Sequence, residues 1–205
     1  MHPPTPLWLV RHAPTAAPPG QVVGHLDVDL SEAGHAAVQV FAEACEAIWP
    51  VPPAHLVSSD LARARATAAP LAARWGLTPH VDARLREVHF GRWEGATWDA
   101  LEREDPAALT AWMTDWVNTP PPGGESFQAL RARVETWVDD WKREARGPTL
   151  VVAHAGSIRA LLCASLGLPS SAAFGFAVEP LHVTRLDAHP PGTWTLSQHG
   201  VQPHS

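Results

Sequence analysis

An arginine and a histidine directly follow a short apolar stretch near the beginning of the chain. Leu7–Val10 is apolar, and Arg11 and His12 stand at the start of a loop rich in proline and glycine. Arginine presents a fork of N–H donors that matches phosphate oxygens, and a neutral imidazole has a nitrogen lone pair that can attack phosphorus. The pair is therefore a candidate phosphate site, although Arg-His alone is too common a dipeptide to establish one.

Three further segments carry groups that phosphoryl transfer requires. Arg63 lies just after a strand-to-helix turn, His154 follows the β-branched run Thr149–Ala153, and Glu87 lies among bulky and basic neighbours. Fixed cationic donors stabilise the charge on a transferring phosphoryl group, and an acid must protonate the departing alkoxide near neutral pH. Together these segments predict a phosphate pocket with its own proton donor.

The residues after His154 read as the opening of a helix. The first N–H groups of a helix have no partner within it, so we expect Ala155 and Gly156 to contribute to binding an anion. Ser157 is interpreted as a cap of the same helix.

Two residues compete for the role of proton donor. Glu87 would have to hold a proton part of the time, which Arg86 and Arg92 oppose if they point inward. His89 is the alternative donor. Loss of activity toward an alkyl phosphate on Glu87→Gln substitution would separate the two.

Strand-like and helix-like runs alternate along the chain. Strands are predicted at Leu7–Val10, His55–Ser58, Thr78–Val81, Thr149–Ala153, and near His182–Leu186 and Trp194–Ser197. Helices are predicted from a Ser31 cap to about Ile48, from a Ser59-Asp60 capping pair to about Trp75, and over Ile158–Leu166. This order predicts an α/β fold, a three-layer sandwich with a mostly parallel central sheet flanked by helices. In such sheets the ligand lies beyond the carboxyl ends of the strands.

A helical, Trp-rich insertion is predicted at about 93–146, within a single domain that spans residues 1–205. Trp137 and Trp141 are four residues apart and share one helix face, which favours packing against the domain over a ligand platform. The run Pro120–Gly124 is interpreted as an ordered loop and not as a domain boundary.

Composition excludes several classes of function. The formal net charge is −6, which argues against a nucleic-acid-binding surface. Cys45 and Cys163 lie far apart in apolar stretches, so we expect two buried, reduced thiols. No apolar run approaches about 20 residues, and the first residues do not resemble a secretory signal, which favours a cytoplasmic protein without a membrane partner.

Taken in this order, the motifs resemble the histidine phosphatase superfamily, also called the phosphoglycerate mutase-like family. The resemblance runs from Leu9 to about Pro169 and includes Gly24–Ser31 and Pro122–Ser126. It implies a phosphoglycerate mutase-like fold.

The resemblance also implies roles for the candidate residues. His12 would be the nucleophile that becomes phosphorylated, and Arg11, Arg63 and His154 would form the phosphate pocket with it. Glu87 falls where the family has the proton donor. No cofactor or metal is expected, because the arginines and His154 supply the positive charge.

Three less specific positions complete the expected substrate site. Thr15 falls where a hydroxyl often helps to hold phosphate in this family, with a loop cap as the alternative interpretation. His25 and Ser126 are expected to line the substrate mouth.

Two departures from the family pattern concern the loop after the nucleophile. Ala13 stands where the family usually has glycine, so the loop must adopt a backbone angle that alanine tolerates or carry strain. The asparagine often found a few residues later is absent, which argues against the mutase branch. The segment Arg11–Gly20 is most similar to the α-ribazole phosphatase branch.

The expected function is that of a metal-independent phosphomonoesterase. It would act through phosphohistidine on a small phosphorylated metabolite, with α-ribazole 5′-phosphate as the candidate. The alternatives are a phosphoglycerate mutase and a non-enzymatic phosphate-binding module on the same fold.

Overall fold

The computed structural model describes residues 3–144, 147–190 and 192–202. One six-stranded sheet has the strand order β3-β2-β4-β1-β5-β6. The strands are β1 (Thr5–Arg11), β2 (His55–Ser58), β3 (His80–Val81), β4 (Thr149–Ala153), β5 (Val183–His189) and β6 (Thr193–Val201). The α-helices are α1 (Glu32–Ile48), α2 (Ala62–Trp75), α3 (Trp98–Glu104), α4 (Pro106–Thr114), α5 (Phe127–Arg143) and α6 (Ala155–Ser165).

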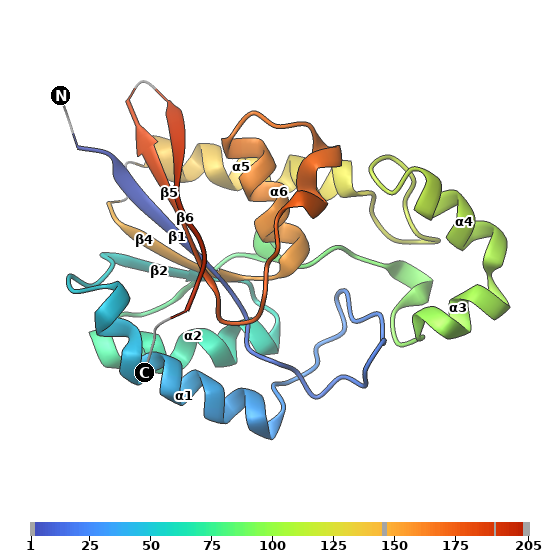
Figure 1. Ribbon diagram of the computed structural model, residues 1–205, viewed down its shortest axis with the longest axis horizontal. Helices are drawn as coiled ribbons and strands as arrows, with labels where there is room; N and C mark the ends of the chain where they lie inside the picture. The colour runs from blue at the N-terminus through green and yellow to red at the C-terminus, as the bar shows by residue number, and fades with distance from the viewer. Residues whose placement is uncertain (1–2, 145–146, 191, 203–205) are drawn as a thin grey trace.

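Strands β1 to β4 run parallel to one another, because β1 pairs parallel with β4, β4 with β2, and β2 with β3. The pairings of β5 with β1 and with β6 are antiparallel. Helices cover both faces of the sheet (Figure 1), so the predicted three-layer α/β fold is confirmed.

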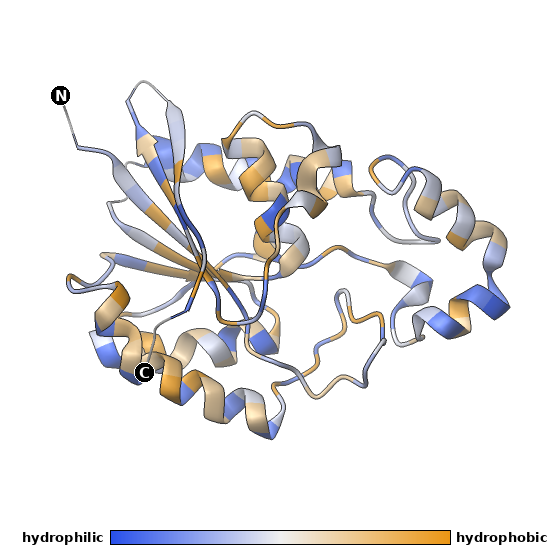
Figure 2. Cartoon of the chain, in the orientation of Figure 1, coloured by the Kyte–Doolittle hydropathy of each residue, from blue (hydrophilic) through white to orange (hydrophobic). Residues whose placement is uncertain are grey.

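The alternation of side chains along β1 explains the two layers. Leu7 and Leu9 pack on one face with residues of α5 and α6, whereas Trp8 and Val10 pack on the other face with residues of α1 and α2. All four side chains are buried. Apolar residues accordingly concentrate on the central strands and on the helix faces turned toward them (Figure 2).

The Trp-rich section divides into two parts. Helices α3 and α4 stand away from the sheet (Figure 1) and share a small core with Val22 and Trp93. Helix α5 instead covers the sheet and buries Trp137 and Trp141 against it, as their spacing predicts.

Several local predictions can be compared with the structure. The Ser31 hydroxyl accepts the Gly34 N–H and caps α1, as predicted. The predicted Ser59-Asp60 cap of α2 is wrong, because the cap position is Leu61 and the Asp27 carboxylate accepts the Ala62 N–H at 2.6 Å.

Two further expectations concern a strand and the thiols. The strand predicted at Thr78–Val81 is shorter than expected and comprises only His80–Val81. Cys45 and Cys163 are free and buried, as predicted. Among the described residues, no helix combines the length and apolar character needed to cross a membrane.

Candidate active site

The carboxyl ends of β1 and β4 bring two histidines together. The strands pair in parallel with Arg11 opposite Ala153, so His12 and His154 leave the sheet at the same edge. The His12 N–H donates to the Ala153 carbonyl at 2.9 Å, and the two imidazole ring centres are 5.1 Å apart. This edge of the sheet is where the sequence predicts the phosphate site.

His12 is held as a neutral imidazole with one nitrogen free. Its side chain is buried, and its Nδ1 lies 2.7 Å from the Ala13 carbonyl oxygen. A carbonyl can only accept, so Nδ1 carries the hydrogen and Nε2 keeps its lone pair. Burial lowers the pKa of His12 to about 3, and the charges of Arg63 and Arg11 act in the same direction. The geometry leaves a nucleophilic nitrogen unprotonated.

Ala13 fits the loop without a glycine-type backbone. Its N–H donates to the Thr67 hydroxyl at 3.0 Å, which ties the loop to α2. Among the described residues other than glycine, only Leu181 has a positive φ, so Ala13 lies outside the left-handed region. The alanine in this position therefore costs no backbone strain of that kind.

Arg63 is a buried guanidinium that ties a loop to the site. Nη1 and Nη2 donate to the Leu26 and Gly24 carbonyls at 2.8 and 2.7 Å, and Nε donates to His154 Nδ1 at 3.2 Å. Arginine has five N–H donors, so two remain for an anion.

His154 is fully buried, and both of its ring nitrogens are engaged. Because Nδ1 accepts from Arg63, Nε2 carries the hydrogen and donates to the Ser59 hydroxyl at 2.9 Å. Burial is the main cause that holds the pKa of His154 well below its usual value; the positive charge of Arg63 lowers it further, as would a protonated His12. The Ser157 hydroxyl accepts the His154 N–H at 3.1 Å, so its predicted role as a cap is confirmed.

Arg11 has an unsatisfied donor beside the nucleophile. Its Nη1 donates to the Val178 carbonyl at 2.8 Å, whereas its buried Nε has no hydrogen-bond partner among the described residues. A buried donor without a partner is costly unless a ligand satisfies it. An oxyanion bound beside His12 would do so.

The Glu87 carboxylate occupies the N-terminus of α6. Its Oε1 accepts the N–H groups of Val88 and Gly156, each at 2.9 Å. The Gly156 donor that the sequence assigns to substrate is thus bound to Glu87 in this structure. Arg86 does not oppose the carboxylate, because its guanidinium pairs with Asp60 at 2.7 Å. Arg92 is exposed.

His25 and His89 form a stacked pair behind Glu87. Their ring centres are 4.7 Å apart, and His25 Nε2 lies 2.8 Å from the Glu87 carbonyl oxygen, to which it donates. His89 Nε2 lies 3.8 Å from the Glu94 carboxylate. The imidazole of His89 therefore faces Glu94 and His25.

Thr15 and Ser126 are engaged in local structure. Thr15 forms an isolated antiparallel bridge with Leu30. Ser126 caps α5 by accepting the Ala129 N–H at 3.2 Å.

Sequence reasoning missed Arg133, which holds the segment that carries Glu87. Its guanidinium donates to the carbonyls of Arg84, Arg86 and Glu87 at 2.7, 2.9 and 2.7 Å, and it pairs with Glu125 at 2.6 Å. Glu125 also accepts the His89 N–H. Glu125 lies in a recognised motif, but no local pattern marks Arg133, because the carbonyls to which it donates are 46 to 49 residues away along the chain.

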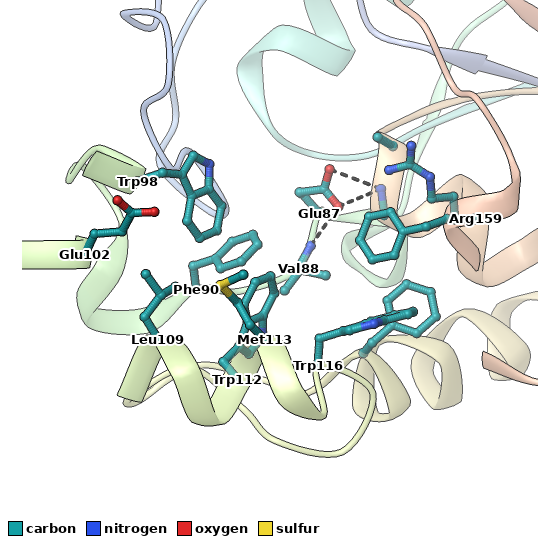
Figure 3. Close-up of a pocket in the computed structure, with 14 residues that line it drawn as sticks. Glu87, Val88, Phe90, Trp98, Glu102, Leu109, Trp112, Met113, Trp116 and Arg159 are labelled. Carbon is teal, nitrogen blue, oxygen red and sulfur yellow. Dashed lines mark hydrogen bonds between the residues drawn. The ribbon is translucent and has the colours of Figure 1, made fainter. Parts of the chain in front are cut away.

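A cavity of about 460 Å³ adjoins Glu87 and the start of α6 (Figure 3). Ala155, Gly156 and Arg159 line it together with side chains from the Trp-rich section. Its volume is typical of a site for a small molecule. Within the described part of the chain, no group of three or more His, Cys, Asp or Glu side chains is placed to hold a metal ion.

Known proteins share both the sequence and the fold. A glucosyl-3-phosphoglycerate phosphatase of Mycobacterium tuberculosis (strain H37Rv) is 39% identical over 175 residues, which cover 80% of this chain and 76% of that protein. An adenosylcobalamin/alpha-ribazole phosphatase of Salmonella typhimurium is 33% identical over 176 residues, which cover 84% of this chain and 85% of that protein.

Solved structures of named phosphatases share the fold of this chain. The alpha-ribazole phosphatase from Shigella flexneri superposes with a TM-score of 0.89 at 28% identity and covers 98% of both chains. A mycobacterial glucosyl-3-phosphoglycerate phosphatase in complex with VO3 superposes with a TM-score of 0.84 at 34% identity, over 97% of this chain and 100% of that chain. The family model described as the histidine phosphatase superfamily (branch 1) matches residues 7–202. The chain therefore belongs to the histidine phosphatase superfamily and is a histidine phosphatase.

Proposed function

We propose that this phosphatase hydrolyses monoesters of small phosphorylated metabolites through a phosphohistidine on His12, without a metal ion. The observation that carries the proposal is the imidazole of His12, which is buried and neutral and whose Nε2 lone pair has no hydrogen-bond partner among the described residues. A nucleophile needs an available lone pair at the reacting pH, and this arrangement supplies one.

The proposed reaction has two steps. In the first, the His12 Nε2 lone pair attacks phosphorus, the bond between phosphorus and the ester oxygen breaks, and the departing alcohol takes a proton from Glu87. In the second, water attacks the phosphohistidine and gives a proton back to the Glu87 carboxylate. Phosphate leaves, and neutral His12 is restored.

The phosphoryl oxygens would be bound by the cationic Arg11 and Arg63, and by the neutral His154 once its Nε2–H exchanges the Ser59 hydroxyl for a phosphoryl oxygen. Arg11 has a buried Nε without a partner among the described residues, and Arg63 has two donors beyond its three hydrogen bonds. Cationic donors fixed by other contacts stabilise charge without reorganising during the reaction. This role is supported by the position of these side chains, which other contacts already hold at the edge of the sheet where His12 lies.

Glu87 is proposed as the proton donor in preference to His89. Glu87 lines the cavity that begins at the N-terminus of α6, where a leaving group would depart. His89 stacks on His25 and faces Glu94. On substrate binding, the Glu87 carboxyl group would exchange an N–H contact for the ester oxygen.

The remaining question is which alcohol the substrate ester carries. We propose α-ribazole 5′-phosphate as the first substrate to test, because the segment Arg11–Gly20 resembles that branch and a relative of that name is 33% identical. Glucosyl-3-phosphoglycerate is the second candidate, since a relative named for it is 39% identical. We also propose that residues 1–205 form one domain around this site.

A substrate panel tests the proposal. Phosphate release from both candidates is measured in the presence of a chelator, with and without a bisphosphate primer. Turnover of α-ribazole 5′-phosphate with a kcat/KM at least tenfold above that of the other ester supports the assignment. A requirement for the primer would identify a mutase, and phosphate binding without any turnover would identify a binding module.

A further inference from the structure

The cavity beside Glu87 has mainly apolar walls, with charged side chains at two separate places. Glu87 and Arg159 lie at the end nearest the phosphate site, and Glu102 lies on α3 (Figure 3). The other side chains that line it are apolar, and they include three tryptophans and three phenylalanines. This composition points to a ligand with an apolar ring.

One wall is a group of rings whose positions are fixed by their mutual contacts. Trp98 and Trp112 stack with their ring centres 5.6 Å apart and their planes at 22°. Phe90 meets both rings edge to face, at 5.8 and 6.0 Å. The buried Trp93 supports Trp112 from another side at 5.9 Å. A wall braced in this way is ready to bind a flat ring without rearranging.

Trp116 forms a second aromatic wall with two phenylalanines. Its ring meets Phe127 at 5.1 Å and Phe174 at 4.6 Å, in both cases edge to face. The Arg159 guanidinium lies 5.0 Å from the centre of the Phe174 ring, and its Nε donates to the Phe176 carbonyl at 3.0 Å. In Figure 3, Trp98 and Trp116 lie on different sides of Glu87.

Apart from Glu87, Glu102 and Arg159, the side chains of these walls are apolar or aromatic and give few partners for hydroxyl groups. A polyhydroxylated leaving group would lose hydrogen bonds to water here and would recover few of them, which opposes its binding. A planar aromatic group loses no such bonds and gains ring contacts. We infer that the cavity between Trp98 and Trp116 is the leaving-group site, and that the substrate is a phosphomonoester whose alcohol carries a planar aromatic ring. The inference rests on the proposed phosphatase function, which orients the substrate with its ester oxygen at Glu87.

The test uses two esters whose alcohols are of similar basicity, benzyl phosphate and ethyl phosphate. The wild-type ratio of kcat/KM, benzyl over ethyl, is expected to be at least about tenfold, since ring contacts of this kind contribute a factor of about two to ten each. Trp98→Leu keeps apolar bulk but removes the ring, and should lower the ratio about two- to tenfold, mainly through KM. Trp98→Phe should restore most of it.

A tryptophan outside the cavity gives the matched control. Trp194 lies on β6 and stacks on Trp141 at 5.7 Å, so Trp194→Phe should leave the ratio unchanged. Equal kcat/KM values for the two esters in the wild type, or a ratio that Trp98→Leu does not lower, would overturn the inference while leaving the phosphatase function intact.

Binding of non-hydrolysable probes separates the two proposals. Benzylphosphonate and ethylphosphonate are titrated against tryptophan fluorescence, with displacement by inorganic phosphate as a second readout. Tighter binding of benzylphosphonate than of ethylphosphonate, lost in Trp98→Leu, supports the aromatic site whether or not any ester is turned over. Absence of turnover would contradict only the phosphatase proposal. Equal affinities would overturn the aromatic site independently of turnover.

Discussion

The Glu87 carboxylate and the Gly156 backbone are in direct contact at the N-terminus of α6. Glu87 Oε1 accepts the Gly156 N–H at 2.9 Å. A Cβ on residue 156 would collide with this oxygen, so only glycine allows the carboxylate to approach the helix so closely. The relationship links a backbone position to the proposed proton donor.

Gly156→Ala should displace the Glu87 carboxylate and lower kcat/KM for an alkyl phosphate about 100-fold, within the range of general acid catalysis. Unfolding in urea should show little loss of stability, because alanine has the higher helix propensity. Gly147→Ala is the control, since among the described residues a Cβ there meets only Ala54, at an ordinary distance of 3.7 Å. Full activity of Gly156→Ala would show that the contact has no role in turnover.

Replacement of each candidate proton donor separates Glu87 from His89. Glu87→Gln keeps the size and the hydrogen-bond acceptor but removes the proton, so turnover of an alkyl phosphate should fall by about 10²–10⁴-fold. Turnover of 4-nitrophenyl phosphate should fall much less, because its leaving group needs little protonation. His89→Gln should change both rates by less than about tenfold. The reverse pattern would assign the proton to His89.

The pH dependence of stability reports on the neutral state of His12. Its pKa is about 3 in the folded protein, against 6.5 when unfolded, so between these values the unfolded chain binds a proton that the folded chain does not. Stability from this group is complete above pH 6.5 and falls as the pH is lowered toward 3. Between pH 8 and pH 4.5 the loss should be about 3 kcal/mol.

His12→Asn removes this titration. Urea unfolding of both proteins at pH 8 and pH 4.5 measures the effect, with His154 present in each. The free energy of unfolding of the variant, relative to the wild type, should rise by about 3 kcal/mol at the lower pH. An identical pH dependence in the two proteins would show that His12 takes up a proton in the folded state as readily as in the unfolded state.

Arg133 should act on the reaction through the position of Glu87. Arg133→Ala leaves the carbonyls of Arg84, Arg86 and Glu87 without this donor and should cost about 2–4 kcal/mol of unfolding free energy. We expect kcat to fall more than KM rises. Arg133→Lys should restore little, because a single ammonium cannot reproduce the planar fork.

The control for Arg133 is Arg143 on the same helix. Arg143 is 72% exposed and pairs only with Asp140 among the described residues, so Arg143→Ala should change stability and kcat very little. Equal effects of the two alanine substitutions would remove the positioning role.

The sequence predicted those features that depend on neighbours along the chain. Apolar runs followed by His12 and His154 indicated two strand ends, and parallel pairing brought these residues to one edge, with 5.1 Å between their rings. The Ser31 cap was likewise a local signal.

Features that depend on distant contacts were not predictable in this way. The cap of α2 comes from Asp27 in the preceding loop, and the Ser59 hydroxyl that looked like a cap binds His154 instead. Arg133 meets segment 84–87 only after α5 packs on the sheet. The contact of Glu87 with Gly156 also requires the whole fold, because 69 residues separate them.

Chemical trapping of the phosphoenzyme tests the central claim most directly. Wild type and His12→Ala are mixed with a phosphomonoester labelled at phosphorus, in the presence of a chelator, quenched in base and mapped by mass spectrometry under conditions that preserve phosphohistidine. The account predicts acid-labile phosphate on His12, formed at least as fast as steady-state turnover and absent from His12→Ala. Turnover with no label on His12, or with label on another residue, would contradict it.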